Sequence, residues 1–171
     1  MVENPDAVDA KLAAWESDLP GVDLEVEGIV DRIALLHKRI RTMLADTLAE
    51  FGLNVGEWAV LGSLLRAGAP YQRSPGALAK SFDLTSGAMT NRLDRLEAEE
   101  LIRRLPDPDD RRGVIVELTP KGRDVWQRAV GAQAAKESFV ASSLDASEQK
   151  QLNALLRRMV QTSEQAATLK E

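Results

Sequence analysis

The sequence predicts a mainly α-helical fold with one small β-hairpin. Along most of the chain, apolar residues recur at every third or fourth position, which is typical of amphipathic helices. The period shortens to two only between Ile102 and Leu118, where we expect strands. The chain has 171 residues, of which 44% are hydrophobic, so it suits one domain with helical extensions.

The first 53 residues predict two helices of different character. Residues 1–25 form an acidic extension, in which a short helix over Ala7–Ser17 carries Trp15. Residues 26–53 hold a long amphipathic helix that ends near Gly52, because glycine readily adopts the left-handed conformation that closes helices. The apolar stripe of this long helix consists of Val26, Ile29, Ile33, Leu36, Ile40, Leu44 and Leu48.

Three helix starts follow in close succession. Asn54 and Glu57 have the spacing of a capping box and open a helix that Gly68 closes. Ser74-Pro75 opens a short helix, with serine as the N-cap and proline at the first helical position. Residues 83–85 then lead into a third helix, and such a short turn is expected of a helix-turn-helix.

The predicted strands lie at 102–105 and 114–118 and are joined by a long polar loop bounded by proline and glycine. We expect them to form a protruding hairpin, which we call the wing. With the helices before it, the wing completes a winged helix-turn-helix lobe over residues 54–120.

Residues 121–171 predict two further helices. Thr119-Pro120 opens the first, which runs towards Val140. Asp145 and Glu148 form a second capping box ahead of the last helix, whose apolar positions also recur with helical spacing.

The third helix of the lobe has a polar face suited to DNA. If Met89, Leu93 and Leu96 face inward, the opposite side carries Ser86, Thr90, Asn91 and Asp94, with Arg95 near its edge. Short hydroxyl and amide side chains can approach base edges in the major groove, and an arginine further along can reach guanine or phosphate. Many exposed helices carry such residues, so this face alone is also compatible with a plain solvated surface.

The tip of the wing strengthens the DNA interpretation. Arg111 and Arg112 lie beyond the two strands, and an arginine on a narrow arm suits the minor groove. Asp110 would hold the neighbouring guanidinium in one orientation. The alternative is a solvated loop. The complete set of predicted DNA-contacting residues is Ser74, Thr85, Ser86, Thr90, Asn91, Arg95, Arg111 and Arg112.

The charge balance is the one feature that opposes DNA binding. Residues 86–112 hold six arginines and seven acidic residues, and the whole chain has a net charge of −5. DNA binding therefore requires the fold to separate these arginines from the acids. A winged-helix module that binds a protein instead of DNA is the alternative that this count favours.

Several segments resemble the MarR family of multiple-antibiotic-resistance regulators, over roughly residues 30–165. They are Ser74-Pro75 with Leu78-Ala79, TSGAMTNRLDRLE at 85–97, LIRR at 101–104, DRR at 110–112 and LTPKG at 118–122. The resemblance implies a homodimer built by the first and last helices, which usually represses transcription from a pseudo-palindromic operator. It also implies base contacts around Ser86, Thr90 and Asn91 and a minor-groove role for Arg112, although a member that activates transcription would look the same.

The N-terminal extension is similar to that of the urate-responsive branch of this family. In that branch a ligand sits between the added helix, the dimer helices and the DNA-binding lobe. Trp15 and Arg92 match its pattern, while Ala59 stands where the branch has an acid, which favours a small organic anion other than urate. The candidate ligand-binding residues are Trp15, His37, Trp58 and Arg92, and the alternative roles are an anchor for Trp15, a core position for Trp58 and a partly buried boundary position for His37.

Composition and missing motifs exclude other classes. With no cysteine and a single histidine, we expect no thiol switch and no transition-metal site. No phosphate-binding loop, nucleophile elbow or Ser/His/Asp set is present, so we expect neither an enzyme nor a cofactor. We expect a cytoplasmic protein, because no apolar run is long enough for a membrane span and the N-terminus lacks a signal-peptide pattern.

Overall fold

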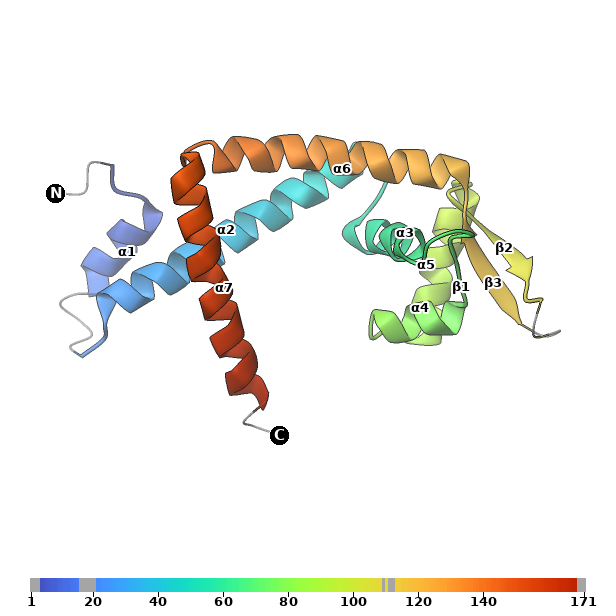
Figure 1. The fold of residues 1–171 in the computed structure, drawn as a ribbon, viewed down its shortest axis with the longest axis horizontal. Helices are drawn as coiled ribbons and strands as arrows, with labels where there is room; N and C mark the ends of the chain where they lie inside the picture. The colour runs from blue at the N-terminus through green and yellow to red at the C-terminus, as the bar shows by residue number, and fades with distance from the viewer. Residues whose placement is uncertain (1–3, 16–20, 109, 111–112, 169–171) are drawn as a thin grey trace. The chain divides into compact units, whose positions relative to one another are not determined.

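The computed structural model describes residues 4–15, 21–108, 110 and 113–168. The chain divides into two compact units, Met1–Ala129 and Val130–Glu171. Figure 1 labels the helices and strands of both units. We describe each unit by itself.

The first unit contains a helix-turn-helix lobe with a small sheet, preceded by two helices. Its helices are α1 (Ala7–Trp15), α2 (Leu24–Ala49), α3 (Val55–Arg66), α4 (Pro75–Ser81), α5 (Ser86–Ala98) and the first part of α6 (Pro120–Ala141). Its strands are β1 (Gln72–Arg73), β2 (Ile102–Pro106) and β3 (Val114–Leu118). The order confirms the predicted sequence of a long helix, a helix, a helix-turn-helix and a hairpin.

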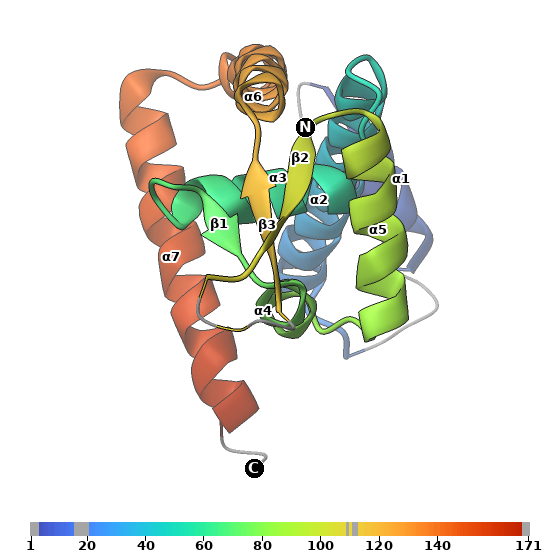
Figure 2. The same ribbon diagram turned by 90° about the vertical axis from the view of Figure 1, so that its right-hand side faces the viewer.

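The three strands form one antiparallel sheet in which β3 lies between β1 and β2 (Figure 2). In the hairpin, Ile102 pairs with Leu118 and Pro106 with Val114. Strand β1 pairs Gln72 with Glu117 and Arg73 with Val116. The sequence analysis missed β1, because two residues are too few to show an alternating pattern.

The helix-turn-helix follows from local capping. The Ser74 hydroxyl accepts a hydrogen bond from the Ala77 amide at 3.2 Å, and the Thr85 hydroxyl accepts one from the Ala88 amide at 3.3 Å. Between the helices, Asp83 adopts a positive φ of 50°, a conformation that aspartate tolerates better than most residues. The turn therefore has the short geometry that the sequence predicts.

The core of this lobe is built from the apolar faces of its helices and the inner face of the sheet. The side chains that are almost completely buried include Leu48, Leu61, Leu64, Leu78, Met89, Leu93, Leu96, Ile102 and Val116. The predicted inward stripe of α5, Met89, Leu93 and Leu96, is confirmed at 1% exposure for each residue. Burial of this stripe determines which face of α5 meets solvent.

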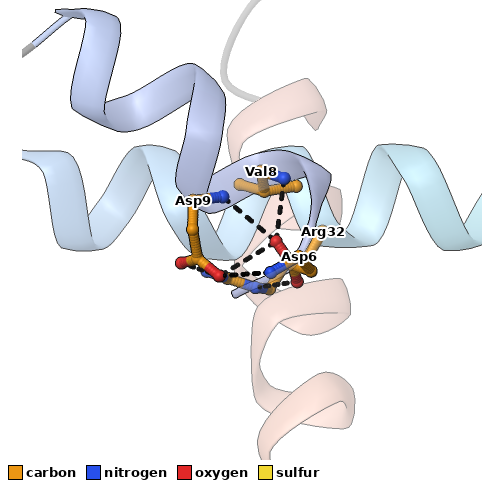
Figure 3. A network of polar contacts seen from close by, with 4 residues as sticks. All are labelled: Asp6, Val8, Asp9 and Arg32. Carbon is orange, nitrogen blue, oxygen red and sulfur yellow. Dashed lines mark hydrogen bonds and ion pairs between the residues drawn. The ribbon is translucent and has the colours of Figure 1, made fainter. Parts of the chain in front are cut away.

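Helix α1 packs on α2 through apolar contacts and ion pairs. Val8 is buried, and the Asp6 carboxylate caps α1 by accepting hydrogen bonds from the amides of Val8 and Asp9 (Figure 3). Arg32 of α2 reaches both Asp6, at 3.0 Å, and Asp9, at 2.5 Å. The backbone hydrogen bond from Asp9 and the side-chain hydrogen bond from Arg32 lower the pKa of Asp6.

Helix boundaries differ from the prediction by a few residues. The described part of α1 runs from Ala7 to Trp15, and the predicted end at Ser17 lies outside the described residues. Helix α2 begins at Leu24, two residues before the predicted start, because the Asp23 carboxylate accepts hydrogen bonds from the amides of Glu25 and Val26.

The second unit contains the rest of α6 and helix α7 (Ala146–Thr168). The predicted capping box is present, since the Asp145 amide donates to Glu148 at 2.8 Å and the Glu148 amide donates to Asp145 at 2.9 Å. Helix α7 leaves its apolar residues exposed, namely Leu152, Leu155, Leu156, Met159 and Val160. Among the helices that the structure describes, none is long and apolar enough to cross a membrane.

Candidate nucleic-acid interface

Helix α5 presents a neutral polar surface at its N-terminal end. Ser86, Thr90 and Asn91 are all exposed, on the side opposite the buried stripe. A Cβ added at Gly87 would meet no atom within 4 Å, so the approach to this end of the helix is open. The Thr90 hydroxyl donates to the Ser86 carbonyl at 2.9 Å, which leaves its lone pairs available to a partner.

Both acidic residues of α5 pair with one arginine from the wing. Arg104 of β2 donates from Nη1 to Glu97 at 2.6 Å and from Nη2 to Asp94 at 2.7 Å, while its amide donates to Glu97 at 3.0 Å. Partial burial opposes the charged guanidinium, but the hydrogen bond to Asp94 and the charge of Glu97 outweigh it and raise the pKa of Arg104. Two of the acids that the sequence analysis counted against DNA binding are therefore paired.

A second polar network lies on one face of the sheet. The Glu117 carboxylate of β3 accepts hydrogen bonds from Gln72 and from Arg103, whose Nε lies 2.8 Å away. The hydrogen bond from Gln72, together with the hydrogen bond and charge of Arg103, lowers the pKa of Glu117. This network joins β1, β2 and β3 and so stiffens the base of the wing.

Two further acids near α5 also have cationic neighbours. Glu100 lies 3.2 Å from the Lys121 ammonium, and the buried Glu57 carboxylate lies 3.6 Å from Arg95. The fold thus separates charge along α5, with paired acids towards its C-terminal half and uncharged side chains at its N-terminal end. The exposed N-terminal end of α5 is therefore free of acids, and pairing offsets part of the acidic charge further along the helix. Arg95 and Arg104 themselves lie beside acids, so the separation of the DNA-binding arginines from the acids stays a prediction.

The wing is described only in part, because Arg111 and Arg112 lie outside the described residues. Around them, the Asp107 amide donates to the Gly113 carbonyl at 3.0 Å, and the Gly113 amide donates to the Asp110 carbonyl at 2.8 Å. A Cβ at Gly113 would lie only 2.8 Å from the Cβ of Asp107, so glycine is needed for this close turn. The predicted orienting role of Asp110 stays a prediction.

The other predicted DNA-contacting residues take defined positions. Ser74 and Thr85 are exposed N-caps of α4 and α5, and each hydroxyl already accepts a backbone hydrogen bond. Arg95 is exposed on the second half of α5, where its guanidinium lies near Glu57. These residues lie in the helix-turn-helix, as the sequence predicted, and their contacts with DNA stay a prediction.

The four candidate ligand residues lie on four different helices, α1, α2, α3 and α5. Arg92 is half-buried and donates to the Gly56 carbonyl of α3 at 3.3 Å. Trp58 stacks on Trp126, with ring centroids 6.0 Å apart and an angle of 14° between the planes. The indole nitrogens of both tryptophans are buried without a hydrogen-bond partner.

The remaining two ligand candidates lie near the N-terminus. Trp15 is half-buried, and the Lys11 ammonium lies 4.1 Å from the centre of its ring. His37 is exposed on α2, whereas the sequence analysis had considered a partly buried position. Its neighbours Leu36 and Ile40 are also exposed, so the described residues of the first unit leave this part of α2 uncovered. Among the described residues, no hydrogen bond or ring contact joins Trp15 to Trp58 or Arg92.

Sequence reasoning missed two residues of this site, Arg104 and Glu57. Arg104 was counted only as one of six arginines, although Asp94 and Glu97, three residues apart on one helix face, signal a place for a shared cation. Glu57 was recognised as a capping residue, but its proximity to Arg95 depends on the packing of α3 against α5. Within the described part of the chain, no three His, Cys, Asp or Glu side chains are grouped to hold a metal ion.

Comparison with known proteins gives consistent results. A family model described as the MarR family matches residues 53–114. The HTH-type transcriptional regulator PecS of Dickeya dadantii (strain 3937) is 33% identical over 148 residues, which make up 85% of this chain and 87% of PecS. A solved structure of a mutant MarR from E. coli complexed with operator DNA is similar with a TM-score of 0.59 and 27% identity, over 81% of this chain and 99% of that one.

The fold has an additional solved relative. The YusO protein from Bacillus subtilis matches with a TM-score of 0.74 and 23% identity, over 82% of this chain and 98% of that chain, which supports the fold alone. The similarity to PecS extends over most of both chains and includes the helix-turn-helix and wing described above. The chain therefore belongs to the MarR family of winged-helix DNA-binding transcriptional regulators.

Proposed function

We propose that this chain is a homodimeric repressor that binds a pseudo-palindromic operator and leaves it when a small organic ligand binds. The observation that carries the proposal is the separation of charge along α5. Its exposed N-terminal end offers Ser86, Thr90 and Asn91, while Arg104 pairs with the acids Asp94 and Glu97.

The proposed DNA contacts follow from this surface. Asn91 can form paired hydrogen bonds with an adenine edge, and the hydroxyls of Ser86 and Thr90 can bond to bases or phosphates. The exposed guanidinium of Arg95 extends the surface towards the backbone. Arg111 and Arg112 lie outside the described residues, and we assign them to the minor groove of the operator. Asp110 would orient their guanidinium groups.

A dimer is supported by apolar residues that the single chain leaves in water. On α2, Val26, Ile29, Val30, Ile33, Leu36 and Ile40 are between 38% and 51% exposed. Helix α7 carries a comparable exposed set, and exposed apolar faces of this size typically pack against another chain. A symmetric dimer would place two α5 helices about 34 Å apart, one turn of DNA.

The dimer is tested by charge insertion into this face. Ile33→Asp should shift the chain from dimer to monomer in sedimentation velocity, because the aspartate would be buried without a partner. Lys38→Asp, on the same helix and outside the apolar set, is the control and should stay dimeric. A dimer that survives both Ile33→Asp and Leu155→Asp would contradict dimerisation through these helices.

Ligand release is proposed to act through Arg92. Within the described residues, its half-buried guanidinium donates a hydrogen bond only to the Gly56 carbonyl. A carboxylate or phenolate on the ligand would be a stronger, charge-assisted partner. Trp15, Trp58 and His37 complete the proposed ligand contacts. The ligand would favour a dimer whose two α5 helices no longer match successive major grooves. It then lowers the affinity of the protein for DNA, and bound DNA lowers the affinity for the ligand by the same factor.

The central experiment measures DNA binding by the purified protein. The duplex comes from upstream of its own reading frame, and the titration covers a salt series with non-specific competitor. We expect tight binding that falls steeply with salt, because phosphate contacts release counterions. Asn91→Ala should weaken binding by about 1–3 kcal/mol, whereas the exposed Asn153→Ala on α7 should leave it unchanged.

Other outcomes of this experiment discriminate between the functions. If the upstream duplex binds weakly, selection from random sequences would identify the operator. Failure of that selection would favour the protein-binding module that the acid count of residues 86–112 suggested. A panel of aromatic carboxylates and phenols then tests release, which Arg92→Ala should blunt and Arg66→Ala should leave intact.

A further inference from the structure

A cavity of about 220 Å³ lies between the start of α3 and the C-terminal half of α5. Its apolar lining includes Leu53, Leu96 and Leu101. Its charged lining consists of Glu57, Glu99 and Arg95. The cavity lies within the first unit, and Arg92, the proposed partner of an anionic effector, is absent from its lining.

Glu57 is the unusual member of this lining, because a carboxylate is rarely buried. The residue is only 6% exposed. One carboxylate oxygen, Oε2, accepts the Asn54 amide at 2.9 Å, and this capping box holds the side chain in place. The other oxygen, Oε1, faces Arg95 at 3.6 Å, which is beyond hydrogen-bond distance. This oxygen is therefore the one that the capping box leaves open to a donor entering the cavity.

Arg95 is a weak partner for this oxygen. Its side chain is 72% exposed, so the guanidinium stays hydrated and gains little from the pair. Within the described part of the chain, its guanidinium makes only this long ion pair, so the side chain can rotate into solvent at little cost. A cation that entered the cavity could therefore take the place of Arg95 beside Glu57.

We propose that this cavity binds a small organic cation, whose primary ammonium group donates to Glu57 Oε1 in place of Arg95. The lining carries two carboxylates and one displaceable cation, so it favours a positive ligand over an anion. An apolar cavity of about 150 Å³ holds benzene, so this volume suits a single ring with a short aminoalkyl arm. The ring would lie against Leu53, Leu96 and Leu101.

Occupancy of the cavity would also act on DNA binding. Arg95 is one of the proposed DNA-contacting residues, and its guanidinium lies beside Glu57 of α3. A bound ammonium takes the place of Arg95 at Glu57 and frees its guanidinium for the DNA backbone, so it strengthens operator binding. DNA must then strengthen cation binding by the same factor. This coupling rests on the proposed function, whereas cation binding by itself does not.

The first experiment measures ligand binding in the absence of DNA. The full-length protein is titrated with benzylamine, with benzyl alcohol as the neutral analogue and with benzoate as the anion, by calorimetry and ligand-observed NMR. We expect benzylamine to bind at least about tenfold more tightly than benzyl alcohol, since a charge-assisted hydrogen bond is roughly twice as strong as a neutral one. Equal affinity for the amine and the alcohol would overturn the proposal.

Two variants locate the bound cation. Glu57→Gln retains the capping box, because glutamine also serves at this position, and its fold is checked by circular dichroism and thermal melting. It should lower benzylamine affinity about tenfold, whereas the exposed Glu25→Gln on α2 should leave it unchanged. Arg95→Ala should raise the affinity severalfold by removing the competing cation. Unchanged affinity in folded Glu57→Gln would refute the site.

The DNA experiment separates this proposal from the proposed function. If benzylamine binds but does not change operator affinity, the coupling through Arg95 is wrong while the cation site stands. If the protein binds no DNA at all, the proposed function is wrong. The cation site is then still tested by comparing the benzylamine affinities of wild type and Glu57→Gln, because that titration contains no DNA. Benzylamine that strengthens operator binding in wild type and not in Glu57→Gln supports both.

Discussion

The ion pairs of Arg104 offer the sharpest test of how this chain accommodates DNA. Arg104→Ala removes the cation that lies 2.7 Å from Asp94 and 2.6 Å from Glu97. Two unpaired carboxylates would then face solvent on α5. Because α5 is the helix proposed to enter the major groove, we expect this variant to bind the operator more weakly than wild type.

The size of the effect follows from Coulomb's law. One carboxylate about 10 Å from a phosphate in water costs about 0.4 kcal/mol. Several phosphates lie within a Debye length of about 8–10 Å from a helix in the groove. Arg104→Ala changes the local charge by one unit, so, summed over several phosphates and after screening, it costs about 0.5–1 kcal/mol, or about two- to fivefold in affinity. The cost should shrink as salt is added, in contrast to the loss of a base contact.

The fold itself should tolerate this change. The side chain of Arg104 is 28% exposed, and its partners Asp94 and Glu97 are more exposed still. Pairs of this kind contribute about 0–1 kcal/mol each after solvent screening. We therefore expect Arg104→Ala to remain folded at room temperature, as judged by circular dichroism and urea unfolding.

The assay is fluorescence anisotropy with a labelled operator duplex, over a salt series, with Arg103→Ala as the matched control. Arg103 also lies on β2 but pairs with Glu117 of β3, so its loss frees no acid on α5. The triple variant Arg104→Ala, Asp94→Asn, Glu97→Gln removes the acids as well and should recover most of the affinity. If the triple variant binds no better than Arg104→Ala, or both arginine variants bind like wild type, the charge-separation argument is wrong.

Two other predictions concern the stability of the first unit. A Cβ at Gly122 would lie 2.0 Å from the Leu101 carbonyl oxygen, so Gly122→Ala should lower the free energy of unfolding by about 3 kcal/mol. Gly87→Ala, where an added Cβ meets nothing within 4 Å, should leave it unchanged or raise it slightly. Urea unfolding checks both, and equal losses would contradict the steric reasoning. Glu117 has a pKa lowered from its ordinary value of 4.5, so its stabilising contribution is complete above that value and lost as pH falls through the lowered pKa. Arg103→Ala should reduce this acid-dependent loss in unfolding curves recorded from pH 7 down to about pH 3, and an unchanged loss would show that Arg103 contributes nothing to it.

The sequence by itself determined the local elements of this protein. The spacing of Met89, Leu93 and Leu96 predicted both α5 and its buried face, because a helix of 3.6 residues per turn brings these positions to one side. The capping pairs Asn54/Glu57 and Asp145/Glu148 predicted helix starts, since their hydrogen bonds span only three residues. Such features depend on neighbours in the chain and can be read without the fold.

Strand β1 and the environment of His37 show where local reading fails. Gln72 and Arg73 are extended because β3, more than forty residues later, provides hydrogen-bond partners. His37 lies on a helix whose apolar stripe is left exposed by the single chain, and sequence periodicity cannot state what covers such a stripe. Both depend on partners that are distant in the chain.

Charge separation along α5 was decided only by the tertiary structure. In the sequence, Asp94, Glu97 and Arg104 are part of a segment, 86–112, whose six arginines and seven acids nearly cancel. The turn after α5 reverses the chain into β2, and this reversal brings Arg104 back against both carboxylates. In the same way, the packing of α3 on α5 sets Arg95 beside the buried Glu57. A count of charges records their sum, whereas the potential at a surface depends on the distances between them, and only the folded chain defines those distances.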